Sequence, residues 1–230
     1  MGLEKLNRSF ENLPDDIKQM YAQELLRQGS ELCRSSFARF EEYFQLMERL
    51  IDKALEHEVK SLKQTAGKLS EEKRPHFWMW EYPAYLENLS PLLRSSFLIA
   101  LYSLFESELR LFCKILKDFE KIPLSLSDLA GSNIEKAKKY IHKIAGYPIL
   151  DEELWKELTD FTLIRNCIVH YNGFINTNKE SQLRTIVNKY QEISLEYDRI
   201  IPSEKYCERM LTKCRQLLEN LYNESLKRIK

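Results

Sequence analysis

Three side chains able to bind a phosphate and move protons lie within six residues of one apolar segment, FTLIRNCIVHYNG, residues 161–173. Arg165 offers a fixed fork of N–H donors that suits a phosphate. Asn166 can hydrogen-bond both to a substrate and to its neighbours. An unperturbed histidine titrates near about pH 6.5, so His170 can take a proton from a ribose 2′-hydroxyl or give one to a leaving oxygen. This set of residue types predicts chemistry on a phosphodiester.

The segment has the periodicity of a helix that opens within residues 148–152 and ends near Gly173. At about 100° per residue its apolar side chains gather within about a third of the circle, and Arg165 lies inside that sector. Asn166 and His170 follow one turn apart on an adjacent line. An unpaired buried charge costs several kcal/mol, roughly, and no Asp, Glu or Lys lies close in sequence to Arg165. Its partner must therefore come from elsewhere.

Each of these residues also has an ordinary structural role open to it. Arg165 can form a buried ion pair with Glu106 or Glu108 of an earlier helix, which is a plausible packing neighbour. His170, near a helix C-terminus, can cap the last carbonyls, a role worth a fraction of a kcal/mol to about 2 kcal/mol. Asn166 can hydrogen-bond a neighbouring helix. The combination of all three on an otherwise apolar helix is what favours a functional site.

The rest of the chain predicts an all-α fold that positions this helix. Only six Gly and seven Pro occur in 230 residues, and they fall mostly between long segments rich in Leu, Glu, Lys, Arg and Gln. Ser90 and Pro91 are typical of a helix start. The first half of the helix that follows is apolar on almost every side, which predicts a position at the centre of the bundle. We expect a bundle of about five to seven helices with long central antiparallel helices. Besides the motif helix, the expected helices cover about 15–63, with Gly29 as a candidate break, about thirty residues from Ser90, 133–146, closed by Gly146, and about 203–229.

Two segments are less regular. Residues 76–91 hold Phe77, Trp78, Trp80, Tyr82 and Tyr85, and we interpret them as an irregular connector that packs its rings on the bundle. The alternative is a base-stacking platform on single-stranded nucleic acid. Residues 176–203 are the least regular part of the second half, and EISLEYDRII, residues 192–201, can form a short extended excursion.

The composition argues against several classes of partner and of site. Lys+Arg and Asp+Glu both total 35, so no bulk charge draws the chain to nucleic acid or to an anionic membrane, and a local patch must do so. Such a patch is offered by Lys136, Lys138, Lys139 and Lys143, as either a solvated helix face or an RNA-phosphate contact. Five cysteines without a C-x-x-C pair and four histidines without metal-ligand spacing predict neither a disulfide framework nor a metal site, and no cofactor is expected.

The N-terminal sequence MGLEKLNRSFENLPDD lacks the apolar core of a signal peptide. The longest apolar stretch, residues 97–105, is about half the length that a membrane span needs. We therefore expect a cytoplasmic protein without a membrane partner.

The run Arg165-Asn166-Cys167-Ile168-Val169-His170 resembles the R-x4-6-H motif of the HEPN superfamily, which lies at the end of a long helix with a polar residue directly after the arginine. The earlier segment SSFLIALYSLFESELRLF is similar to the helix that those domains place before the motif. The resemblance covers residues 90–230. It leaves residues 1–89 as an N-terminal helical extension, packed on the same bundle.

Many HEPN proteins are metal-independent endoribonucleases of toxin–antitoxin, abortive-infection and antiviral systems, in which two protomers bring their motif helices together. The resemblance therefore implies a cytoplasmic homodimer that cleaves RNA, with an antitoxin or another defence-system protein as a partner. Arg165 would stabilise the phosphate, His170 would transfer protons at the 2′-hydroxyl, and Asn166 would support both, leaving a 2′,3′-cyclic phosphate. Glu106, as an acidic orienter, and Tyr171 are supporting candidates.

One feature departs from a subgroup of these toxins, which carries a tyrosine two residues after the histidine and is controlled by nucleotide transfer to it. Here Tyr171 follows His170 directly, and position 172 is Asn. Other members bind RNA or a protein without chemistry. A non-catalytic HEPN-like binding module therefore stays open beside the nuclease, as does a purely structural helical protein in which Arg165 pairs with Glu106 or Glu108.

Overall fold

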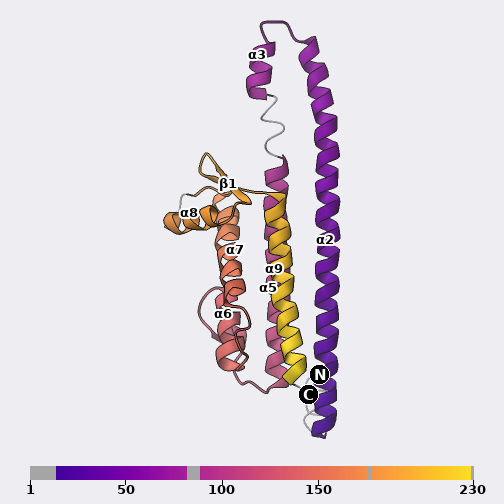
Figure 1. Ribbon diagram of the computed structural model, residues 1–230, viewed down its shortest axis with the longest axis vertical. Helices are drawn as coiled ribbons and strands as arrows, with labels where there is room; N and C mark the ends of the chain where they lie inside the picture. Colours follow the sequence, from indigo (N-terminus) through magenta and orange to yellow (C-terminus); the bar gives the residue numbers. More distant parts are fainter. Residues whose placement is uncertain (1–13, 82–88, 176–177, 229–230) are drawn as a thin grey trace, which may run out of the picture. The chain divides into compact units, whose positions relative to one another are not determined.

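A computed structural model describes residues 14–81, 89–175 and 178–228, and within them it confirms the predicted all-α class. Tyr82, Tyr85 and the first thirteen residues lie outside the described residues. The described part contains seven α-helices and one two-stranded sheet (Figure 1). The helices are α2 (Asp15–Lys68), α3 (Arg74–His76), α5 (Leu89–Phe119), α6 (Asn133–Lys139), α7 (Glu152–Tyr171), α8 (Glu180–Lys189) and α9 (Glu204–Arg228). Shorter helical turns are η1 (Phe77–Glu81), η2 (Leu126–Asp128) and η3 (Tyr140–Ile144), and the strands are β1 (Ile193–Glu196) and β2 (Arg199–Pro202).

The chain divides into two compact units. Unit 1 comprises Met1–Phe37, Leu104–Thr159 and Lys213–Lys230, and unit 2 comprises Ala38–Ser103 and Asp160–Thr212. The helices α2, α5, α7 and α9 each contribute residues to both units. Each unit thus takes residues from both sides of position 89, and the assignment of residues 90–230 to a HEPN-like domain stays a prediction.

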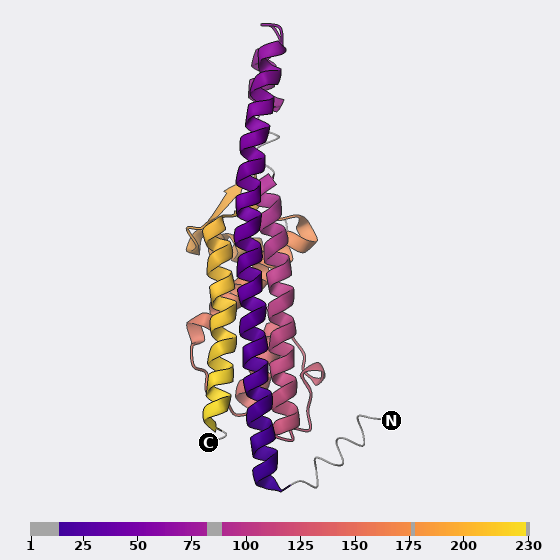
Figure 2. The same cartoon turned by 90° about the vertical axis from the view of Figure 1, so that its right-hand side faces the viewer.

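In unit 1 the segments of α5 and α9 lie between α2 on one side and α6 with the start of α7 on the other (Figures 1 and 2). Tyr222 of α9 meets Phe112 of α5 edge-on, with ring centroids 5.0 Å apart. Helix α2 passes this pair at Gly29, where an added Cβ would lie 3.0 Å from the Tyr222 ring and 3.2 Å from Ile115. The candidate break at Gly29 is therefore wrong, because this glycine permits close helix packing and the helix continues through it.

In unit 2, Phe97 of α5 packs against Phe40 and Phe44 of α2, with ring centroids 5.3 and 4.3 Å apart. A half-buried ion pair lies beside these rings. Arg94 of α5 donates from Nε and Nη2 to the two carboxylate oxygens of Glu48 of α2, each at 2.8 Å. This bidentate geometry joins the two helices with directional bonds.

The predicted extended excursion is confirmed as the antiparallel hairpin β1–β2, in which Ser194 pairs with Ile201. Tyr197 and Asp198 form its two-residue loop with φ of 48° and 62°, as a type I′ turn requires. Helix α8 lies beside this hairpin (Figure 1) and was not predicted. Its N-cap residue Lys179 makes no side-chain cap, so the sequence carries no start signal there.

Residues 74–81 are helical rather than irregular. Phe77 is buried against Leu62 and Ala66 of α2, whereas Trp78 and Trp80 are 40% and 65% exposed. The expected packing of this stretch therefore holds for Phe77 but not for Trp80. None of the described helices combines the length and the hydropathy that a membrane crossing requires.

Candidate functional site

Helix α7 carries the predicted motif and has a capped start. Asp151 Oδ1 accepts a hydrogen bond of 2.9 Å from the Leu154 N–H, which satisfies one of the free donors of the first turn. The helix then buries one continuous apolar face. Its fully buried members are Leu158, Phe161 and Ile164.

The C-terminal end of α7 is fixed to the hairpin. Gly173, at a φ of 83°, donates its N–H to the Cys167 carbonyl at 3.1 Å and closes the helix. Its own carbonyl accepts from the Ile200 N–H at 2.9 Å, and the Ile175 N–H donates to the Asp198 carbonyl at 2.8 Å. The backbone that follows His170 is therefore held by main-chain hydrogen bonds.

Arg165 is half-buried and is held by neutral groups of unit 2. Its Cζ lies 4.8 Å from the centroid of the Tyr102 ring, and Nη1 donates to Asn166 Oδ1 at 3.0 Å. Its Nε is buried without a hydrogen-bond partner. Among the described residues of this unit, no carboxylate forms an ion pair with Arg165. A cation over an aromatic face is stabilised by about 0.5–2 kcal/mol, so the charge is supported but not neutralised.

His170 is exposed in the last turn of α7. Within the described part of the chain its ring makes no hydrogen bond, so it does not cap the last carbonyls through one. Apolar side chains beside it are also exposed: Val169 by 40%, Tyr171 by 48% and Phe174 by 43%. The end of the motif helix is thus an open surface of mixed apolar and polar character.

The structure brings Asn166 to Arg165 but does not bring His170 to it. Asn166 and His170 are one turn apart and differ by about 40° around the helix axis. Arg165 and His170 are five residues apart, so they leave the helix roughly 140° from each other. Arg165 and His170 of one copy of α7 therefore leave the helix toward different sides.

The acidic candidates lie in unit 1. Glu106 Oε1 accepts a hydrogen bond of 2.6 Å from Asn133 Nδ2. Burial raises the pKa of Glu108, whose Oε2 has no hydrogen-bond partner, while a hydrogen bond from Ser36 opposes the shift. The pairing of Arg165 with either residue joins two units and stays a prediction.

The four predicted RNA-binding lysines differ from one another. Lys138 pairs with Glu152, and Lys136 lines a cavity against α5. Lys139 and Lys143 are exposed. Their role in RNA binding stays a prediction.

Sequence reasoning missed two features. Tyr102, beneath the guanidinium of Arg165, lies in the apolar run ALYSLF, where nothing marks it as different from its neighbours. The second is a basic face on α5 formed by Arg110, Lys114 and Lys117. Their spacing of four and three residues was visible in the sequence and would have identified this face.

No protein-family model, no curated protein and no solved structure matches the chain. Among the described residues, no group of three or more His, Cys, Asp or Glu side chains could hold a metal ion. All five cysteines are buried and free. The function of the site is therefore inferred from its own residues.

Proposed function

We propose that the chain is a metal-independent endoribonuclease of the HEPN type that acts as a homodimer in a toxin or antiviral defence role. The observation that carries the proposal is the state of Arg165. A half-buried guanidinium supported by a ring and an amide retains N–H donors for an anion, and a phosphate suits their planar geometry.

The chemistry follows from the residue types. The ribose 2′-oxygen attacks phosphorus as its proton leaves to an imidazole, and the bond from phosphorus to the 5′-oxygen breaks as that oxygen gains a proton. The products are a 2′,3′-cyclic phosphate and a 5′-hydroxyl. Arg165 stabilises the charge that develops on the phosphate, and His170 transfers protons, a contribution of typically about 10² to 10⁴ in rate. Asn166 holds the guanidinium in position through its 3.0 Å hydrogen bond.

A dimer is supported by the geometry of α7. Because Arg165 and His170 leave one helix in different directions, a second copy related by a two-fold axis supplies the missing group. The exposed Val169, Tyr171 and Phe174 offer the apolar area that such a contact would cover. In the resulting cleft the arginines face water and substrate rather than a dry core.

The test is cleavage of a mixed-sequence RNA in EDTA by the purified full chain. We expect products ending in a 2′,3′-cyclic phosphate, no cleavage of the same sequence made with 2′-deoxyribose, and loss of cleavage in Arg165→Ala and His170→Ala. His57→Ala is the matched control, because His57 is also an exposed histidine on a helix of unit 2. Cleavage that survives both motif substitutions contradicts the proposal, as does a monomer that cleaves at the full rate.

The alternative is a non-catalytic HEPN-like module that binds RNA or a protein. Trp78 and Trp80 favour it, because exposed indole rings can stack on unpaired bases. Retention of RNA without any product, lost in Trp80→Ala but unchanged in His170→Ala, would select this alternative.

A further inference from the structure

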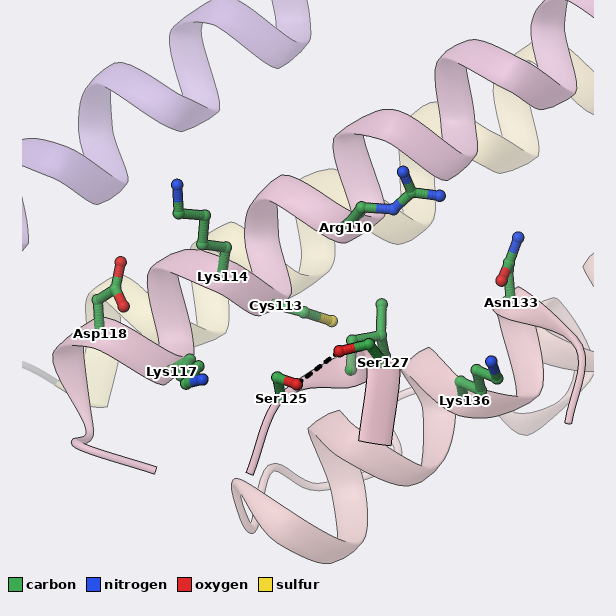
Figure 3. A pocket seen from close by; sticks show the side chains of 10 residues that line it. Arg110, Cys113, Lys114, Lys117, Asp118, Ser125, Ser127, Asn133 and Lys136 are labelled. Carbon is green, nitrogen blue, oxygen red and sulfur yellow. Dashed lines mark hydrogen bonds between the residues drawn. The ribbon is translucent and has the colours of Figure 1, made fainter. Parts of the chain in front are cut away.

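Unit 1 contains a cavity of about 540 Å³ at the C-terminal part of α5 (Figure 3). Three parts of the chain line it. These are the last three turns of α5, the Ser125–Ser127 segment at η2, and the first turn of α6. None of its residues belongs to the Arg165 site, and its volume lies in the range of small-molecule sites.

The lining is strongly basic. Arg110, Lys114 and Lys117 come from one face of α5, and Lys136 comes from α6, against Asp118 as the single carboxylate. Figure 3 shows Lys117 and Lys136 on either side of the two serines, whereas Arg110, Lys114 and Asp118 do not point toward them. Like charges at this helical spacing repel, so an anion beside this face of α5 would be stabilising.

Within the part of the chain that the structure describes, these cations have little counter-charge, apart from a charge interaction between Lys117 and Asp128. Among the described residues, none of the four forms a salt bridge or a hydrogen bond. Other cations of the same unit behave differently, since Lys138 pairs with Glu152 and Lys213 with Glu157. Lys117 and Lys136 are moreover half-buried, which raises the cost of leaving them without a counter-charge.

The carboxylates near the cavity already accept hydrogen bonds from backbone N–H groups, a hydroxyl or an amide. Asp128 Oδ2 accepts from both the N–H and the hydroxyl of Ser125 at 2.7 Å, and these bonds hold the pKa of Asp128 below its ordinary value. Glu135 caps α6 through Ser132, and Glu106 accepts from Asn133. These bonds also fix the loop between α5 and α6, so the cavity wall is pre-formed.

The lining also indicates what the cavity does not bind. It contains no aromatic side chain, so no base can stack there as it does in single-strand binding sites. Its groups suited to oxygen anions are cations, chiefly the ammonium groups of Lys117 and Lys136, because the Ser125 hydroxyl already donates to Asp128 and the two serine hydroxyls lie 2.7 Å apart in a bond with each other. Cations on two sides of one concavity match several phosphate groups on one compact molecule.

We propose that this cavity is a binding site for a small molecule carrying at least two phosphate groups, held chiefly by Lys117 and Lys136. Inorganic oligophosphates and nucleoside polyphosphates share this chemistry. Apart from Lys136, which is also a predicted RNA-phosphate contact, the residues of this site differ from those of the proposed nuclease site. Its readout is the binding of a small molecule rather than RNA cleavage.

The test uses sodium triphosphate, ATP and inorganic phosphate as probes, with binding to the full chain measured by titration calorimetry. We expect saturable binding of triphosphate, at least about tenfold weaker binding of inorganic phosphate, and a loss of about tenfold or more in the double variant Lys117→Ala/Lys136→Ala. ATP binding as tight as that of triphosphate identifies a nucleotide ligand, and weaker ATP binding identifies an oligophosphate. The matched control is Lys139→Ala/Lys143→Ala, which removes the same charge from exposed positions of α6 and η3 outside the cavity.

Four results would overturn the proposal. They are no triphosphate binding to the wild type, equal affinity for triphosphate and inorganic phosphate, equal losses in the two double variants, and tighter binding of a short RNA with the same dependence on Lys117 and Lys136. The last result would assign the cavity to an RNA backbone. Thermal unfolding of each variant, followed by circular dichroism, shows that a loss of binding is not a loss of fold.

Discussion

The substitution Arg165→Met tests whether Arg165 serves the function of the protein or the stability of its fold. Methionine retains much of the side-chain volume and can remain in contact with the Tyr102 ring, while it removes the charge. If Arg165 serves a ligand, its removal should abolish activity but leave the folded state nearly as stable as before. This outcome would be typical of a functional residue that the fold tolerates rather than needs.

The magnitude follows from the contacts of Arg165. The substitution loses a cation–π contact of about 0.5–2 kcal/mol and one hydrogen bond of about 1–2 kcal/mol. The substitution also removes a half-buried cation whose Nε has no hydrogen-bond partner, and this removal should stabilise the folded protein by about 1–3 kcal/mol. At the mid-points of these ranges the free energy of unfolding should fall by somewhat less than about 1 kcal/mol, and the full ranges reach from a gain of about 1.5 to a loss of about 3 kcal/mol.

Arg94→Met is the matched control, because Arg94 is also a half-buried arginine of unit 2. Its side chain is 21% exposed, and it forms two 2.8 Å bonds to Glu48, which is 8% exposed. Removing one partner leaves a buried carboxylate uncompensated, so the loss should be about 2–4 kcal/mol. Urea denaturation at constant pH measures both variants. A loss of more than about 3 kcal/mol in Arg165→Met would show that Arg165 has a structural ion pair, and would refute the functional reading.

Two further predictions concern unit 1. Gly29→Ala should lower the free energy of unfolding by about 1–2 kcal/mol in urea denaturation, because its Cβ would lie 3.0 Å from the buried Tyr222 ring. The control Gly67→Ala should raise it by about 0.5–1 kcal/mol, since nothing lies within 4 Å of that helical position, and equal effects would contradict the packing account. Burial raises the pKa of Glu108 above its ordinary 4.5, so its ionisation lowers stability as pH rises through that raised pKa. Glu108→Gln should therefore be more stable than the wild type at pH 7, and the difference should vanish below about pH 4 in denaturation curves, whereas a constant difference at all pH values would be contrary to this account.

The helices were predictable where local chemistry alone decides their ends. Helix α5 begins at Leu89, one residue from the predicted Ser90-Pro91 start, because proline fits the first turn and no breaker follows until Pro123. Gly146 adopts a φ of 69°, as its predicted capping position requires. Helix α8 was missed because its stability comes from tertiary burial of Leu183, Ile186 and Val187 rather than from a cap or a strong propensity.

The site was predictable only along one helix. Periodicity placed Asn166 beside Arg165, and the two side chains are hydrogen-bonded. The apolar sector of this helix extends to Val169, yet Val169 is 40% exposed, because the sector continues past the part of α7 that is covered. The choice of Tyr102 as the group beneath Arg165 depends on which helices pack together, and periodicity within one segment carries no such information.

Equal numbers of cationic and anionic residues do not make this protein electrically uniform. Some cations are neutralised locally, as Arg94 is by Glu48 and Lys138 by Glu152. Among the described residues, Arg165 in unit 2 and the cations of the cavity in unit 1 form no salt bridge, and both groups present donors that suit a phosphate. If they are separate sites, Arg165→Met should leave triphosphate affinity unchanged, and Lys117→Ala should leave RNA cleavage unchanged at saturating RNA. A loss of both activities on either change would show instead that one phosphate ligand serves both groups of cations.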